Sequence, residues 1–70
     1  MTTETEKDNC YALNSALKVA GFITSVDNMD FTIKCKGVFI VSDQNIKNSY
    51  HINGQKYYSI DQVVTLIRGM

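Results

Sequence analysis

Apolar positions in the first third of the chain recur at the intervals of an amphipathic helix. Thr3 and Glu6 have the spacing of a capping box, and Asp8 offers a later start. Gly21 stands where a left-handed residue commonly ends a helix. We therefore predict a helix from Thr3 or Asp8 to Gly21, whose apolar stripe comprises Cys10, Leu13, Ala16, Leu17 and Ala20.

The middle of the chain has the pattern of β-structure. Residues 22–26 are short and rich in β-branched side chains, and residues 27–30 supply turn chemistry. Residues 31–36 alternate, which predicts that Phe31, Ile33 and Cys35 point inward and that Thr32, Lys34 and Lys36 point outward. Gly37 then predicts a bulge or a bend.

Residues 38–41 form a continuous apolar run, Val-Phe-Ile-Val. Such a run is typical of a central strand covered on both faces, or of a strand whose outer face meets another molecule. The polar residues 42–49 that follow predict a loop or a single helical turn.

Asn53-Gly54 lies between two strand-like runs and predicts a hairpin with a type I′ turn. Ser59 and Gln62 repeat the capping-box spacing at the start of a closing helix. The apolar stripe of this helix comprises Ile60, Val63, Val64, Ile67 and Met70.

These elements predict an α+β fold: an antiparallel sheet of three or four strands, with an N-terminal and a C-terminal helix packed on one face. We expect one small domain over residues 1–70, frayed at residues 1–5. The predicted inner layer consists of Leu13, Leu17, Phe22, Phe31, Ile33, Phe39, Val41, Ile60, Val63, Val64 and Ile67.

Composition excludes more classes of function than any motif in the sequence does. The 70 residues carry seven Lys/Arg and seven Asp/Glu, and 44% are hydrophobic, which excludes intrinsic disorder, a strongly basic nucleic-acid binder and an acidic DNA mimic. No apolar run reaches the roughly 20 residues that span a bilayer, and the polar start is not that of a signal peptide. We therefore expect a cytoplasmic protein without a membrane partner.

A chain of this size buries only about 60% of its unfolded surface, so its core is marginal. Cys10 and Cys35 form no CxxC pair, and we expect both to be buried free thiols in a reducing compartment. Association with a partner, including a second copy in a homo-oligomer, is then the expected source of extra stability.

His51 is the one side chain with an ordinary pKa near neutrality. It suits a general base or a dyad with Cys35, and equally a plain strand residue beside the Asn-Gly turn. The favoured interpretation is the plain strand residue, because no serine stands in a nucleophile elbow. Two cysteines and one histidine cannot complete a four-ligand zinc site within one chain, although a site shared across a dimer stays open. The glycines form no phosphate loop. We expect no enzyme, no cofactor and no metal.

Charge is unevenly distributed. Residues 1–30 contain five acidic and two basic side chains, a balance of minus three, whereas residues 31–58 contain four lysines and one aspartate, a balance of plus three. Lysines interleaved with aromatics suit an acidic protein surface or a single-stranded nucleic acid. The predicted partner-binding residues are Lys34, Lys36, Tyr50, Lys56 and Tyr57.

Residues 50–70, with the Asn-Gly turn, Lys56-Tyr57-Tyr58 and a following helix, resemble the wing-plus-helix end of MerR-type regulators and phage excisionases. In those families a helix-turn-helix precedes the wing, whereas residues 31–41 here have a strand pattern. The resemblance covers less than a third of the chain, and no DNA contact is transferred from it.

The sequence thus predicts a small non-enzymatic protein-binding module, an inhibitor or adaptor of a larger protein machine. Stand-alone proteins of this size and style are common in phages and mobile elements, which suggests a host enzyme or defence system as the target. The alternative is a small nucleic-acid-binding regulator that uses the 50–58 hairpin as a wing.

Overall fold

The computed structural model describes residues 2–70, with side chains from Glu4 onward. Its helices are α1 (Thr2–Val19) and α2 (Ile60–Arg68). Met1, within the segment expected to fray, lies outside the described residues. The strands are β1 (Thr24–Asp27), β2 (Thr32–Cys35), β3 (Val38–Ser42), β4 (Tyr50–Ile52) and β5 (Gln55–Tyr57).

The five strands form one antiparallel sheet in sequence order, β1-β2-β3-β4-β5. The α+β class is confirmed, with five strands in place of the expected three or four. Each consecutive pair of strands is joined by a turn or a short loop, so no strand needs a crossover connection.

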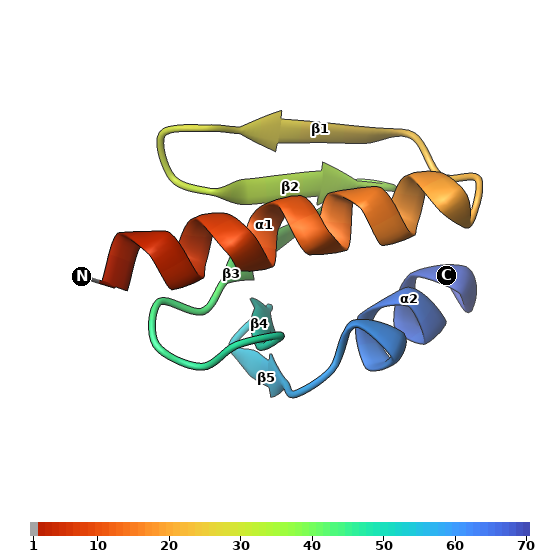
Figure 1. The fold of residues 1–70 in the computed structure, drawn as a ribbon. Helices are drawn as coiled ribbons and strands as arrows, with labels where there is room; N and C mark the ends of the chain where they lie inside the picture. Colours follow the sequence, from red (N-terminus) through yellow and green to blue (C-terminus); the bar gives the residue numbers. More distant parts are fainter. Residues whose placement is uncertain (1) are drawn as a thin grey trace.

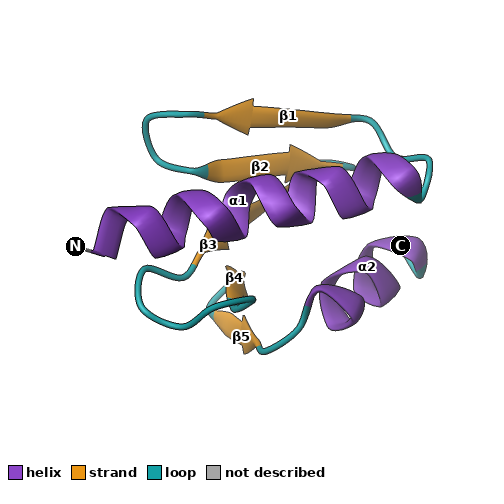
Figure 2. Ribbon diagram, viewed as in Figure 1, coloured by secondary structure: helices purple, strands orange, loops and turns teal. Residues whose placement is uncertain are grey.

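Both helices lie on one face of the sheet, and no element of residues 2–70 covers the opposite face (Figures 1 and 2). α1 lies over β1, β2 and β3, and α2 packs beside α1 and against β5. Neither helix of the described chain combines the length and hydropathy that a membrane span requires. The core between the two layers consists of Cys10, Leu13, Leu17, Ile33, Cys35, Ile40, Tyr50, Ile52, Val63 and Ile67.

The ends of the helices follow the expected local chemistry. Gly21 has a φ of 95°, and the next amide, of Phe22, donates to the carbonyl of Leu17, which closes α1. At the start of α2, the Ser59 hydroxyl accepts a hydrogen bond from the amide of Gln62. The Gln62 side chain in turn accepts from the amide of Tyr58, so two amides at this helix start are satisfied.

Two hairpins turn on two residues each. Asn53 and Gly54 have φ values of 51° and 81°, as a type I′ turn requires, and this prediction is confirmed. Lys36 and Gly37 have φ values of 52° and 79° and form the same kind of turn between β2 and β3. The prediction of a bulge or bend at Gly37 is therefore wrong: the residue belongs to a tight turn.

This turn reverses the predicted orientation of β3. Because Cys35 pairs directly with Val38, the two side chains point to the same, inner face. Ile40 follows on the inner face and is fully buried. Phe39 and Val41, predicted to be core residues, instead point away from the helices and are 61% and 42% exposed.

Candidate functional site

The face of the sheet that the helices leave uncovered is the main open surface built from strands. Cross-strand pairing aligns its side chains in two rows across the sheet. We call this surface the outer face; its members are Ser25, Lys34 and Phe39 in one row, and Asp27, Thr32, Val41, His51 and Lys56 in the other.

Phe39 and Val41 form the apolar centre of the outer face. Both stand on β3, the middle strand, so polar positions of the neighbouring strands surround them. Thr32 and His51 flank Val41 on either side, and Lys34 is opposite Phe39. An apolar centre within a polar rim is the organisation of protein–protein interfaces.

Lys34 is held against this centre. Its ammonium lies 5.5 Å from the centroid of the Phe39 ring, within the range of a cation–π contact. The described residues place no carboxylate within ion-pair distance of it. Its charge is therefore available to an acidic group on a partner.

A buried carboxylate organises the other end of the face. Asp43 Oδ1 lies 2.8 Å from His51 Nε2 and 3.7 Å from the Lys56 ammonium. Asp43 Oδ2 accepts hydrogen bonds from the amides of Asn45 and Ile46, at 2.9 and 2.6 Å. The His51 contact, followed by these amides and Lys56, lowers the pKa of Asp43 to about 2. The positive charge at this end is thus offset locally.

Asn9 fastens the 43–49 loop to α1. Its side-chain amide donates to the carbonyls of Asp43 and Ile46, at 3.0 and 2.9 Å, and its side-chain oxygen accepts from the amide of Asn48 at 2.7 Å. Asn9 is 1% exposed. This role of Asn9 was not predicted from the sequence. The available signal was its position four residues before Leu13, on the buried stripe of the helix.

The predicted partner-binding residues divide between the two faces. Lys34 and Lys56 lie on the outer face, as expected. The prediction that Tyr50 lies on the binding surface is wrong, because its side chain is fully buried and its hydroxyl donates to the carbonyl of Asn9 at 2.6 Å. Burial raises the pKa of Tyr50. Tyr50 is opposite Ser42, an inward position of β3, and this pairing sends it into the core.

Lys36 is exposed but does not lie on the outer face. It stands in the β2–β3 turn, beyond the alternation of the strand, and reaches the other layer. Its ammonium donates to the carbonyl of Met70 at 3.0 Å and lies 3.5 Å from the carbonyl of Ile67. It also lies 5.6 Å from the centroid of the Phe22 ring. Lys36 therefore ties the end of α2 to the sheet.

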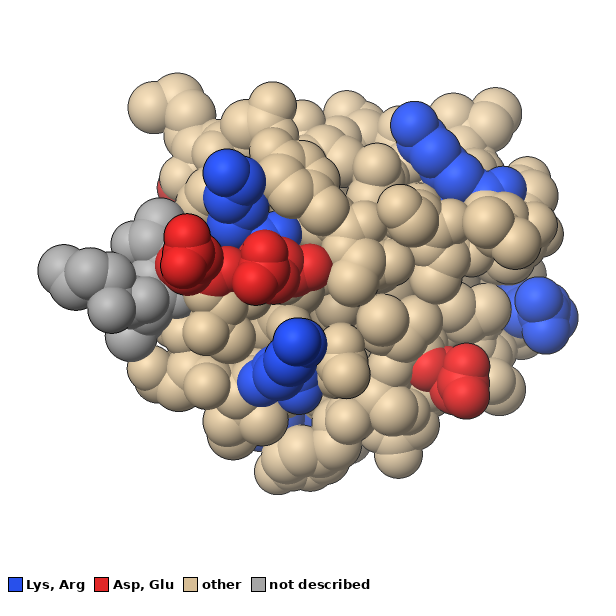
Figure 3. All heavy atoms as spheres, viewed as in Figure 1, with Lys and Arg blue, Asp and Glu red and all other residues tan. Residues whose placement is uncertain are grey.

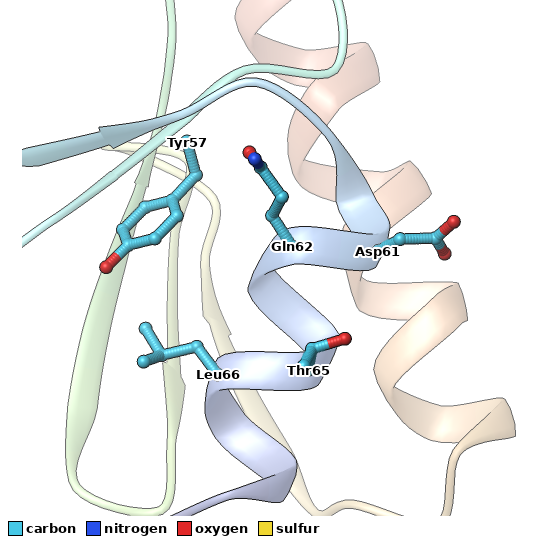
Figure 4. A pocket seen from close by; sticks show the side chains of 5 residues that line it. All are labelled: Tyr57, Asp61, Gln62, Thr65 and Leu66. Atoms are coloured by element: carbon cyan, nitrogen blue, oxygen red, sulfur yellow. The ribbon is translucent and has the colours of Figure 1, made fainter.

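Tyr57 turns toward α2 instead of the outer face. It is half-buried, and Figure 4 shows its ring beside Leu66, with Gln62 directed toward the segment between β5 and α2. These side chains, with Asp61 and Thr65, line a groove of about 450 Å³. Alternation on β5 directs Lys56 outward, and its neighbour Tyr57 must then face the helix.

The arrangement separates the groups that a nucleophilic dyad would need. His51 is on the outer face, whereas Cys35 is buried on the inner face of β2, and Ser42 is buried on the inner face of β3. Both cysteines are free, and burial raises the pKa of each thiol. Among the residues with described side chains, no cluster of three His, Cys, Asp or Glu could hold a metal ion.

The segment that resembles the wing-plus-helix end of MerR-type regulators does form a hairpin followed by a helix, β4, β5 and α2. Strand β3 and the 43–49 loop precede it, where those families have a helix-turn-helix. A scan against protein-family models and searches of curated proteins and of solved structures gave no match.

Proposed function

We propose that this protein is a non-enzymatic binding module that docks another protein on its outer face. The observation that carries the proposal is the exposure of Phe39 and Val41 on the middle strand, 61% and 42%. Neighbouring large apolar side chains in solvent mark interaction surfaces, whereas single ones are ordinary.

The partner's chemistry follows from the surface. An apolar patch would pack on Phe39 and Val41, and a carboxylate beside it would meet the Lys34 ammonium, which already lies over the Phe39 ring. An aromatic anchor adjoining a charge is a common arrangement at interface hot spots. We infer a partner with an apolar centre and at least one acidic side chain at its edge.

A protein partner is favoured over a nucleic acid by the charges of this face. Its two lysines, Lys34 and Lys56, are balanced by Asp27 on the face and by Asp43 beside it. Nucleic-acid affinity depends on lysine and arginine side chains that neutralise several phosphates. The 50–58 hairpin contains one lysine, and that lysine is paired with Asp43.

In this role the module would act as an inhibitor or adaptor of a larger protein machine. An origin in a phage or mobile element, with a host enzyme or defence system as the target, is part of the same proposal. So is a cytoplasmic location, which the two free thiols suit.

The test is a tagged pull-down from host lysate with matched variants, with and without nuclease, read by mass spectrometry. Phe39→Ser is compared with Ile23→Ser, which removes an even more exposed apolar side chain before β1. Lys34→Glu is compared with Lys18→Glu on α1. We expect one stoichiometric protein that survives nuclease and is lost with Phe39→Ser and Lys34→Glu only.

Two results would overturn the proposal. Retention of the partner by both outer-face variants would place the binding surface elsewhere. Recovery of nucleic acid alone, lost on nuclease treatment and with salt-dependent affinity, would establish the regulator instead.

A further inference from the structure

A second unpartnered surface lies on the other side of the molecule, between the two helices. It is a groove of about 570 Å³ with a mostly apolar lining. Ala16, Val19 and Ala20 of α1 line one side, and Ile60 and Val64 of α2 line the other. Val19 is 88% exposed. Figure 3 shows this helix-bearing side, where acidic and basic side chains gather at the left of the view and a broad uncharged area occupies the centre.

Two opposite charges mark the ends of the groove along α2. Asp61 stands in the first turn of α2 and Arg68 in the last, and both line the groove. Seven residues are about two helical turns, so the two side chains lie on one stripe about 10 Å apart. Neither takes part in an ion pair within the described chain.

We propose that the groove binds a second copy of this chain, to form a two-fold symmetric dimer. The two helix layers face each other, and α2 runs antiparallel to α2 of the partner, with the axis passing near Val64. Asp61 then meets the partner subunit's Arg68, and Arg68 meets the partner subunit's Asp61. Val19 and Val64 of the two copies are covered in the centre.

The charges along α2 favour a second copy of this chain as the partner, because they complement themselves. A two-fold axis brings the same patch together from both subunits, so a patch must complement itself end to end. An acid and a base at opposite ends of one helix face satisfy this condition in the antiparallel arrangement. A parallel arrangement would oppose Asp61 to Asp61 and Arg68 to Arg68, which is repulsive.

The dimer would carry two copies of the outer face, one on each subunit. The two helices, whose side chains line the groove, lie on one side of the sheet, and the outer face lies on the other (Figure 2). Dimerisation through the helices therefore leaves both outer faces open and directed away from each other. Such a dimer is bivalent, and its avidity for a repeated partner would exceed the affinity of one site.

Charge exchange tests the dimer in the purified protein. Sedimentation velocity over a concentration series measures its dissociation constant in the wild type, Asp61→Arg, Arg68→Asp and the double variant Asp61→Arg/Arg68→Asp. We expect a wild-type dimer in the micromolar range, weakened at least about tenfold by each single change because like charges then meet twice. The double variant restores the pairs with exchanged signs, and dimerisation returns.

Matched controls separate the interface from general effects of charge and folding. Asp30→Arg and Lys47→Asp make the same charge changes at exposed positions outside the groove and should leave the dissociation constant unchanged. The double variant places both charges against the helix dipole, so α2 itself is least favoured there. Recovery of the dimer in that variant therefore cannot come from a more stable helix.

A protein that stays monomeric to about 1 mM, the weak limit of measurable association, would overturn the proposal. So would a dimer that survives both single changes, or one that the double change fails to restore. A dimer lost with Phe39→Ser but kept by Asp61→Arg would place self-association on the outer face. The pull-down outcome is independent of these results, because none of its variants lies in the groove.

Discussion

Asn9 joins segments that are distant in the sequence through a single side chain. Its partners Asp43, Ile46 and Asn48 are 34, 37 and 39 residues away. One amide has two donor hydrogens and an acceptor oxygen, and all three functions are used here. The loop beside the outer face thus depends on one buried polar residue of α1.

Replacing Asn9 by alanine should destabilise the fold by about 2–3 kcal/mol, because it leaves the carbonyl of Asp43 and the amide of Asn48 without a partner in a buried or half-buried setting. Asn14→Ala is the matched control, since Asn14 is half-buried and its side chain accepts one hydrogen bond from the Thr24 hydroxyl. Its expected cost is under about 1 kcal/mol. Chemical denaturation of both variants measures the difference, and equal costs would contradict the role given to Asn9.

At the scale of elements, the β2–β3 turn determines which half of an apolar strand faces solvent. A turn of two residues pairs Cys35 with Val38, and side chains on directly paired residues share a face. One more or one fewer residue in the turn would have brought Phe39 and Val41 into the core. The exposed centre of the outer face is therefore a product of turn length.

The same turn connects the sheet to α2 through Lys36. Lys36→Met retains an aliphatic side chain and removes the ammonium that lies over the Phe22 ring and binds the carbonyls of Ile67 and Met70. We expect a loss of about 0.5–1 kcal/mol, the usual contribution of a cation at a helix C-terminus. Amides in the last turn of α2 should exchange faster with deuterium.

Lys34→Met is the control for that experiment. Lys34 precedes the turn on an exposed strand position and contacts only the outer face. The melting temperature of the Lys34→Met variant and the exchange of its α2 amides should stay close to those of the wild type. Equal effects of the two changes would show that Lys36 does not dock α2.

At the scale of the whole molecule, one layer of helices over five strands covers one side of the sheet. The described core is continuous across α1, the sheet and α2, so the fold does not need the outer face for burial. The side of the sheet that packs on the helices therefore stabilises the fold, and the outer face is left for the proposed binding. Substitutions at Phe39 are expected to change association much more than folding.

Acid should weaken the whole fold through Asp43. Its pKa is lowered from 3.8 in the unfolded chain to about 2 in the folded one. The stabilisation is therefore complete above pH 3.8 and is lost as the pH falls toward 2. With partial solvation of its partners, this amounts to about 1–2 kcal/mol.

Asp43→Asn retains an oxygen for the loop amides and removes the charge that His51 and Lys56 contact. Glu6 of α1 lies near the same loop and stays in both proteins. Denaturation between pH 2 and 7 should show a variant that is less stable at neutral pH and converges with the wild type near pH 2. Parallel curves would mean that Asp43 does not cause this dependence.

Much of the architecture was predictable from local patterns. The stripe at Leu13 and Leu17, the Ser59 cap and the Asn53-Gly54 turn depend on neighbouring residues alone, and the structure confirms each. The burial of both cysteines was predictable for the same reason, because each stands on an apolar stripe.

The candidate site was predicted only in part. Lys34 stands between Ile33 and Cys35, both predicted to point inward, so its outward position could be inferred. Lys56 and Tyr57 were predicted to share one surface, whereas alternation on β5 directs them to opposite faces. Tyr50 begins a three-residue strand, too short to show which face it joins, and Lys36 lies in a turn that has no face. Asn9 was missed because its partners come together only when the loop folds back on α1.

By itself, the sequence determined the two helices, the strand-forming segments between them, the Asn53-Gly54 turn and the α+β class. The tertiary structure decided which side chains of β3 point toward the helices and which point to solvent. The run Val38–Val41 is apolar at every position, so it carries no alternation from which an inner side can be chosen. Pairing through the Lys36-Gly37 turn supplied that choice, because a shift of one residue in a strand exchanges its two faces.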